Sequence, residues 1–171
     1  MGQYLNIDDL QTLYQDHVKE ISAFVYNFFK NPEETFDTTQ DIFFKLFEHI
    51  QNQKIETTNP RAYIYKVARN HCIDVLKKKK IQTTTYEANS ALLSNGRRSE
   101  AKIIDSLIID SIYNYIENNL PETEATIFKL KFIYNFNLEE IVDVVGTSLS
   151  TVSRIIKKIT LELEEKFPDI L

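Results

Sequence analysis

The sequence predicts an all-α protein made of two small helical domains joined by a flexible linker, the second domain containing a helix-turn-helix. Apolar residues recur at three- and four-residue spacing along nearly the whole chain, which is the period of an amphipathic helix. The 171 residues include only 3 glycines and 4 prolines, so few residues interrupt these segments. The pattern is lost in one long polar stretch after residue 80, and this break divides the chain into two halves.

The first predicted domain, residues 1–80, begins with two amphipathic segments. In the first, the apolar residues between Leu10 and Phe28 share one face, and Asn31-Pro32 ends the helix. The second is expected to start near Asp37 and to turn a stripe of apolar side chains inward. Both segments are therefore expected to pack against a common core.

The third segment, from Asn59 to Lys80, combines an apolar face with a polar one. Asn59 followed by Pro60 marks a helix start, because asparagine caps the first turn and proline lacks an N–H that would have no partner there. The polar side is basic, carries an amide and is flanked by tyrosines: Tyr63, Tyr65, Lys66, Arg69, Asn70, Lys77 and Lys78. Such a face suits a nucleic-acid backbone and an unstacked base. A solvated amphipathic helix explains the same pattern equally well.

Basic charge is concentrated in this third segment. The whole chain has a formal net charge of -5, whereas residues 59–80 carry seven basic residues and one acidic residue, a local charge of +6. The segment therefore marks a local site for an anionic partner rather than a general affinity for nucleic acid.

Residues 81–105 are predicted to form the linker. The stretch from Ile81 to Ser99 is rich in Thr, Ser and Asn and shows no sustained period, as is typical of a flexible connection. Helical spacing then resumes in the second domain, residues 106–171, with breaks at Pro121 and around Asn135.

The end of the second domain has the pattern of a helix-turn-helix. Asn137 opens a short helix with a glutamate three residues on, Gly146 stands where a helix needs a left-handed residue, and Ser148 can cap the next helix. The outward residues of that last helix are candidates for DNA contact: Ser150, Thr151, Ser153, Arg154, Lys157 and Lys158. A structural corner between two helices with a glycine turn remains the alternative.

The residues do not form a recognisable catalytic or metal-binding constellation. No Gly-rich phosphate loop or catalytic triad order occurs and the three histidines lack ligand spacing, so we expect no enzyme activity, metal or cofactor. Cys72 is the single cysteine, which suits a reducing cytoplasm. The first residues do not resemble a signal peptide and no apolar stretch is long enough to span a membrane, so we expect a cytoplasmic protein without membrane insertion.

Three motifs, in this order, resemble the extracytoplasmic-function (ECF) sigma factors of bacterial RNA polymerase. The run from Asp37 to Phe47 is similar to the family's region 2.2, and the segment 59–80, with its run RAYIYKVARN, is similar to regions 2.3 and 2.4. Residues 120–122 and 138–152 are similar to region 4. The resemblance leaves only the linker unmatched. It implies a promoter-specific initiation factor that leaves the chemistry of RNA synthesis to the polymerase.

The resemblance implies a role for each motif. Region 2.2 would dock on the β′ clamp helices of core RNA polymerase through an acidic, partly aromatic set: Asp37, Gln40, Asp41 and Phe44. Regions 2.3 and 2.4 would open the minus-ten element, with Asn70 reading a flipped base and either Tyr63 or Tyr65 facing the DNA. Region 4 would bind the minus-thirty-five element as duplex DNA, and the polymerase's β flap.

The sequence departs from the family in region 4, where Ser153 and Ile155 stand at positions that are commonly basic. The family also implies an anti-sigma factor as a partner, and we expect a monomer when the protein is free. Two other interpretations remain open: a polymerase-independent helix-turn-helix regulator, and an all-α adaptor that resembles an anti-sigma factor. The Asp37–Asp41 motif favours a sigma factor, because only a sigma factor needs a surface for docking polymerase.

Overall fold

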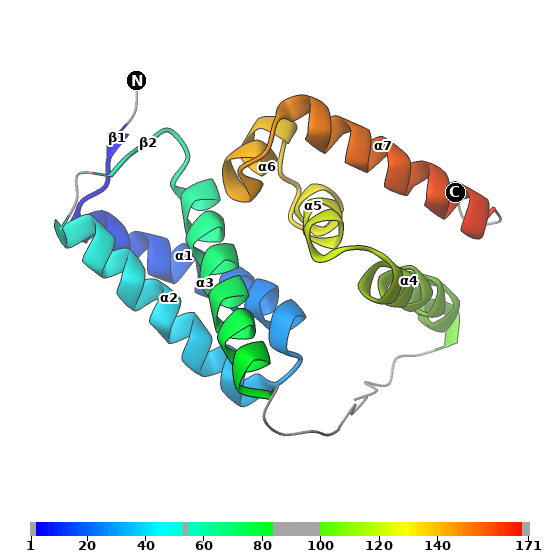
Figure 1. Cartoon of the computed structure of the whole chain (residues 1–171), viewed down its shortest axis with the longest axis horizontal. Coiled ribbons are helices and arrows are strands. Elements are labelled where there is room, and N and C mark those ends of the chain that lie inside the picture. The colour runs from blue at the N-terminus through cyan, green and yellow to red at the C-terminus, as the bar shows by residue number, and fades with distance from the viewer. Residues whose placement is uncertain (1–2, 53–54, 84–99, 169–171) are drawn as a thin grey trace. The chain divides into compact units, whose positions relative to one another are not determined.

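The computed structural model describes residues 3–52, 55–83 and 100–168, and Figure 1 shows their elements. The chain divides after residue 87 into two compact units. Apart from two short strands, every described element is an α-helix, so the predicted all-α class with two helical domains is confirmed. Among the described residues, no helix combines the length and apolar character needed to cross a membrane.

The described residues of the first unit form three helices and a minimal two-stranded sheet. Its elements are β1 (Gln3–Tyr4), α1 (Ile7–Phe29), α2 (Pro32–Asn52), β2 (Glu56–Thr57) and α3 (Pro60–Thr83). The strands were not predicted; they pair antiparallel, with Gln3 opposite Thr57. Because this pairing joins the start of the chain to the segment before α3, it fixes the approach to that helix.

Asparagine caps begin all three helices of this unit. Asn6 caps α1 in a reciprocal arrangement with Asp9, in which the Asn6 side chain accepts from the Asp9 N–H and the Asp9 carboxylate accepts from the Asn6 N–H. Asn31 caps α2, so the Asn31-Pro32 pair not only follows α1 but also starts α2, five residues before the expected Asp37. Asn59 caps α3 by accepting from the N–H of Ala62 at 3.0 Å, as predicted.

The core of the first unit lies where α1, α2 and α3 meet. Its buried apolar side chains are Ile21, Phe24 and Val25 of α1, Ile42 and Leu46 of α2, and Ile64, Tyr65, Ala68 and Cys72 of α3. These positions recur at three- and four-residue spacing, so each helix buries one stripe and exposes the opposite one. The exposed stripes of α2 and α3 are therefore fixed by the packing.

In the second unit, residues 100–168 are described and form four helices: α4 (Glu100–Asn119), α5 (Glu122–Phe132), α6 (Leu138–Val145) and α7 (Leu149–Lys166). Both ends of the predicted linker are helical, because α3 continues to Thr83 and α4 begins at Glu100. Lysine is a good helix former and no Gly or Pro follows it there, so the helix continues past Lys80. The rest of the predicted linker, residues 84–99, lies outside the described residues.

The predicted helix-turn-helix forms through the caps that the sequence indicated. Asn137 and Glu140 make a complete capping box at the start of α6. Gly146 ends α6 in the left-handed region, with φ 74°, and Ser148 caps α7 by accepting from the N–H of Thr151. Behind this corner, Ile116, Ala125, Ile159 and Leu163 form a buried cluster that holds α7 against α4 and α5. The cluster presents the opposite face of α7 to solvent.

Replacing Gly146 tests the backbone requirement of the turn. No atom lies within 4 Å of a Cβ built at Gly146, so the cost of Gly146→Ala comes from its φ of 74° rather than from a clash. We expect Gly146→Ala to lower the free energy of unfolding of the second unit by about 1–2 kcal/mol in urea unfolding of the full chain. Gly146→Asn is the control and should lower the free energy of unfolding less, because asparagine tolerates this conformation. Unchanged stability of the alanine variant would contradict the strain argument.

Candidate nucleic-acid interface

One exposed stripe of α2 carries the four predicted docking residues. Asp37, Gln40, Asp41 and Phe44 are all exposed, and their spacing of three, four and seven residues puts them on one side of the helix. Phe44 is 62% exposed, an unusual position for so large an apolar side chain. The structure thus gives these residues a continuous polar and aromatic surface.

Phe36 belongs to the same stripe and was missed from the sequence. It is also 62% exposed and lies one turn before Gln40. The signal was present, since Phe36, Gln40 and Phe44 follow at four-residue intervals, but α2 was expected to begin only at Asp37. With the helix starting at Pro32, Phe36 joins the exposed face.

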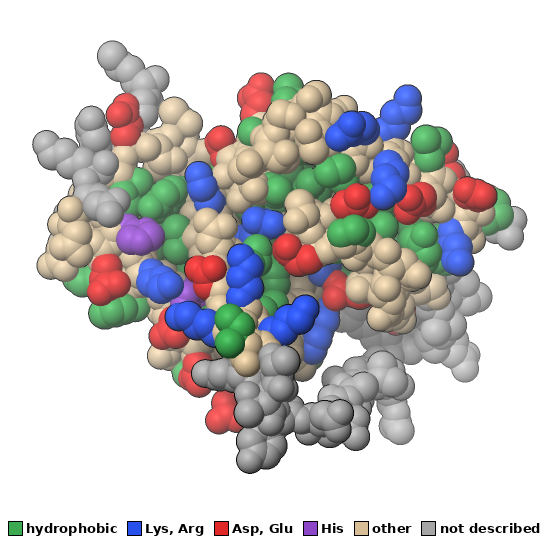
Figure 2. Space-filling view, in the orientation of Figure 1, with side chains coloured by type: hydrophobic (Ala, Val, Ile, Leu, Met, Phe, Trp, Pro, Cys, Tyr) green, Lys and Arg blue, Asp and Glu red, His purple; other side chains and the backbone are tan. Residues whose placement is uncertain are grey.

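The outer face of α3 presents an amide between basic side chains. Lys66, Asn70 and Lys77 follow at intervals of four and seven residues and are all exposed, as is Lys78. Figure 2 shows Lys and Arg side chains gathered over α3. These four residues are therefore accessible to a phosphate backbone or to a base.

Tyr65 cannot make the DNA contact that was considered for it, because it is buried, with 0% of its surface exposed. Its ring packs edge-to-face on Phe24 of α1 at a centroid distance of 5.1 Å. Its hydroxyl lies 3.4 Å from the Glu20 carboxylate, which also accepts from Arg61 at 3.1 Å. Of the two tyrosines, Tyr65 thus packs inward, while Tyr63 stays partly exposed.

Arg69 is the second correction, because it is only 8% exposed and so is not placed on the accessible basic face. Two further cations of this segment have partners within the unit. Arg61 pairs with Glu20, and the Lys79 ammonium lies 2.6 Å from Glu34. The high local charge counted from the sequence thus overstates the charge available to a ligand, because part of it holds α3 to α1 and α2.

A groove of about 350 Å³ lies between α2 and α3. It is lined by Lys45, Glu48 and His49 of α2 and by Tyr63, Lys66, Val67, Asn70, His71 and Asp74 of α3. The Tyr63 hydroxyl and the His49 ring nitrogen Nδ1 are 3.2 Å apart and join the two walls. Burial raises the pKa of Tyr63, so the hydroxyl stays protonated at neutral pH. The volume and polar lining suit a small planar group with hydrogen-bonding edges.

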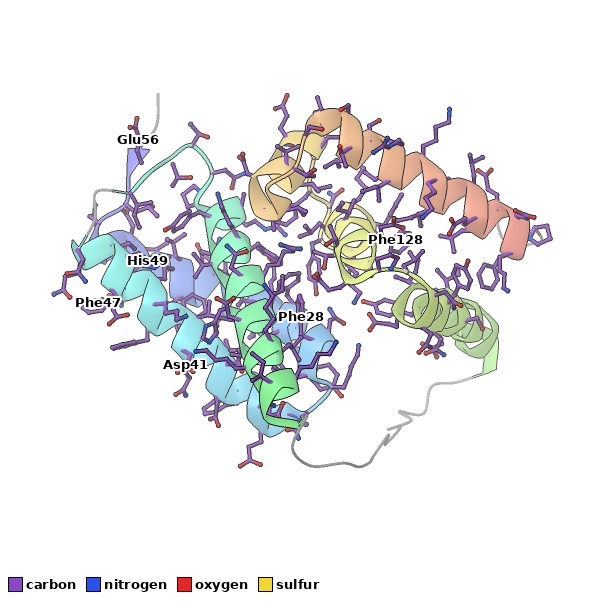
Figure 3. The ribbon with its side chains drawn as sticks, in the orientation of Figure 1. Phe28, Asp41, Phe47, His49, Glu56 and Phe128 are labelled. Carbon is purple, nitrogen blue, oxygen red and sulfur yellow. The ribbon has the colours of Figure 1, made fainter. Side chains whose placement is uncertain are left out.

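His71 forms part of the groove between the predicted docking and DNA-binding surfaces. Its Nε2 atom lies 3.8 Å from the Asp41 carboxylate. Asp41 and His49 of α2 are labelled in Figure 3. Burial lowers the pKa of His71, as does the positive charge of Lys45, so the ring is neutral at neutral pH. His71 was not predicted as a site residue. The histidines were considered only as metal ligands, and the spacing of His71 from Ile64 and Val67 puts it within the apolar face of the helix.

The outer face of α7 has the predicted character of a recognition helix. Ser150, Ser153, Arg154 and Lys157 are exposed. Thr151 is partly buried, and its hydroxyl lies 2.8 Å from that of the capping Ser148. These residues follow the turn at Gly146, so small polar groups stand at the start of the helix and basic ones further along.

Lys158 differs from the other candidates on α7, because it binds α5. Its ammonium lies 2.9 Å from the Glu124 carboxylate and 3.7 Å from Glu162. The hydrogen bond to Glu124 raises the pKa of Lys158. The lysine therefore links α5 and α7. Only the part of its side chain that stays exposed beside this pairing is available to DNA.

Within the part of the chain that the structure describes, no group of three or more His, Cys, Asp or Glu side chains is placed to hold a metal ion. Cys72 is buried in the core of the first unit and forms no disulfide with another described residue. The described site therefore presents hydrogen-bonding and charged groups for binding.

Comparison with known proteins matches both units to one family. The model of sigma-70 region 2 matches residues 13–81, and the model of sigma-70 region 4 matches residues 118–164. Together they cover more than half of the chain, which therefore belongs to the sigma-70 family of transcription initiation factors. The two matches fall on separate helical units and in the order that the motifs indicated, which confirms the predicted sigma factor.

Among curated proteins, the chain is similar to the RNA polymerase sigma factor SigV of Bacillus subtilis (strain 168), at 24% identity over 143 residues, which are 84% of this chain and 81% of that protein. The fold is similar to that of the sigma factor RpoE from Bartonella quintana, which was solved in complex with the anti-sigma factor NepR. The TM-score is 0.71 and the sequence identity is 14%, and the match covers 93% of this chain and 96% of that one.

A second solved structure has the same fold. CnrH, in complex with the cytosolic domain of CnrY, matches with a TM-score of 0.64 and 16% identity over 97% of this chain and 92% of that one. The chain is thus an ECF sigma factor that binds core RNA polymerase and directs promoter-specific transcription initiation.

Proposed function

We propose that the first unit performs two tasks of this initiation factor with two neighbouring surfaces: α2 docks the polymerase, and the groove beside α3 holds a base extruded from the minus-ten element. The observation that carries this proposal is the groove itself. It has about the volume of a small ligand site and is lined by Asn70, whose amide can both donate to and accept from the edge of a base.

The docking role of α2 is supported by its composition. Phe36 and Phe44 would be buried by a partner, and burying an aromatic side chain is a main source of interface energy. Asp37 and Asp41 beside them suit a basic partner surface, which steers association and fixes its register. The stripe on α2 favours a polymerase-bound factor over a helix-turn-helix regulator that acts alone.

The strand-holding role of α3 follows from charge around the groove. Lys66 lines the groove on one side of Asn70, and Lys77 and Lys78 lie further along the same helix. Phosphates of a single strand laid along α3 would be neutralised by these ammonium groups, while Tyr63 offers a partly exposed ring beside the base. Tyr65 and Arg69 would act from inside, by fixing the orientation of α3.

The second unit would bind the minus-thirty-five element with α7. Small hydroxyl side chains at the start of the helix allow close approach to base edges, and Arg154 and Lys157 provide contacts to phosphate or guanine. We further propose that the protein has no enzymatic activity of its own, acts in the cytoplasm as a monomer when free, and is held by an anti-sigma factor. The anti-sigma partner is suggested by the similar structure of RpoE, which was solved in complex with the anti-sigma factor NepR.

Run-off transcription tests the proposed division of roles. Core RNA polymerase with this protein is incubated with fragmented genomic DNA of the source organism, and the transcripts identify the promoters on which variants are then compared. We expect initiation from a defined set of promoters that core polymerase alone does not use.

The docking surface is tested by Asp41→Lys. Reversing the charge in the middle of the stripe should lower the affinity for core polymerase at least tenfold, because a cation would then face the basic partner surface. The affinity is measured by fluorescence titration of labelled protein with core polymerase. Asp16→Lys makes the same charge change at an exposed position of α1 and should leave the affinity unchanged. Equal affinities of the two variants would exclude a docking role for Asp41.

The base pocket is tested by Asn70→Ala. The variant should bind core polymerase with normal affinity. The fraction of promoter that it opens should fall about tenfold, because the extruded base loses its amide partner. Permanganate reactivity of thymines in the minus-ten element measures the opening. Asn114→Ala removes an exposed amide from α4 and serves as the control. Normal permanganate reactivity with the Asn70 variant would remove Asn70 from the pocket.

The recognition helix is tested by comparing Arg154→Ala with Lys158→Ala. The arginine variant should weaken binding to the upstream duplex element and reduce the magnitude of the log–log salt slope by roughly one unit, the contribution of one phosphate contact. Because Lys158 pairs with Glu124, its variant should change this slope less. The slopes come from anisotropy titrations of holoenzyme on upstream duplex DNA at several salt concentrations. The reverse ranking would contradict the assignment.

A further inference from the structure

A buried histidine in the wall of the groove lacks hydrogen-bond partners among the described residues. His71 is 9% exposed, and neither Nδ1 nor Nε2 makes a hydrogen bond within that part of the chain. The nearest carboxylate, that of Asp41, is 3.8 Å from Nε2, which is beyond hydrogen-bonding distance. A buried polar group left without a partner is costly, so each such group in a folded protein calls for an explanation.

The surroundings of His71 keep its ring neutral. Burial lowers its pKa, and among the charged groups facing it Lys45 of α2 and Lys78 of α3 act in the same direction. Asp41 of α2 and Asp74 of α3 oppose them. A neutral imidazole carries one donor and one acceptor, so it can pair with a group that offers both.

His71 lies in the wall of the groove, where its donor and acceptor can pair with a bound group. The residue lines the groove next to Asn70 in the chain and four residues after Val67, whose side chain is the apolar part of the same wall. Asn70 and His71 thus bring an amide and an imidazole to one groove of about 350 Å³. A nucleobase has adjacent donors and acceptors along one edge, which is the arrangement that these two side chains can match.

We propose that His71 is a second base-binding residue of the groove and that it hydrogen-bonds the extruded base together with Asn70. This inference rests on the proposed function of the groove, and it adds a specificity-determining residue to it. The base supplies the partner that the imidazole lacks in the free protein. A base that cannot pair with the imidazole leaves that group buried and unsatisfied, so His71 discriminates between bases as well as holding one.

The experiment compares variants of the holoenzyme on fork-junction DNA with a single-stranded minus-ten element. One probe is intact, and a set of otherwise identical probes each lacks a single base of the non-template strand. The extruded position is the one at which removing the base weakens binding of the unsubstituted protein but no longer affects the Asn70→Ala variant. His71→Phe keeps a planar ring without hydrogen-bonding groups, and His71→Gln keeps a donor and an acceptor.

We expect His71→Phe to weaken binding of the intact probe about three- to tenfold, and to leave binding of the probe abasic at the extruded position unchanged. His71→Gln should restore most of the loss. Thermal unfolding of each free variant reports separately on folding, so that the comparison between the two probes stands even for a less stable variant.

Three results would overturn the inference. If His71→Phe weakens binding of the intact and the abasic probe equally, the residue only supports the packing of α2 and α3. If His71→Phe weakens binding of neither probe while Asn70→Ala still abolishes the effect of the missing base, the groove binds a base without His71. The proposed function of the groove then stands. If the unsubstituted protein binds every abasic probe as well as the intact one, the base pocket itself is excluded and both proposals fail.

Discussion

The packing of α3 against α1 through Tyr65 is the contact on which the candidate site depends. The buried ring meets Phe24 edge-to-face, and Glu20 of α1 binds both the Tyr65 hydroxyl and Arg61. An aromatic pair of this kind contributes beyond the area that it buries. Because Tyr65 is fixed on the inner side, Asn70 is turned outward and into the groove.

The groove and the docking stripe share the helix α2. Asp41 belongs to the exposed stripe and lies 3.8 Å from His71, which lines the groove beside Asn70. A partner that draws the Asp41 carboxylate toward its own cations would therefore also change the electrostatic surroundings of His71. The short distance gives the two surfaces a physical means of influencing each other within one unit.

Much of the fold follows from local sequence signals. The amphipathic periods predicted the helices, and the caps at Asn59, Asn137 and Ser148, with the glycine at Gly146, placed their ends. The start of α2 and the strand pairing were missed. Asn31-Pro32 can end one helix or begin the next, and the pairing of β1 with β2 joins segments more than fifty residues apart, for which a local pattern has no signal.

The sequence by itself determined that the chain is all-α and divided into two units, since that conclusion needs only periodicity and caps. The order of its motifs indicated a sigma factor by resemblance, and the two family matches established it. The sequence also determined which stretch is basic and where its amide lies. Only the tertiary structure decided that Tyr65 and Arg69 face inward, that Lys158 pairs with Glu124, and that His71 lines the groove. The reason is physical. A helical period distinguishes an apolar from a polar face, but a long side chain at the border of the two faces is placed by the neighbouring helices.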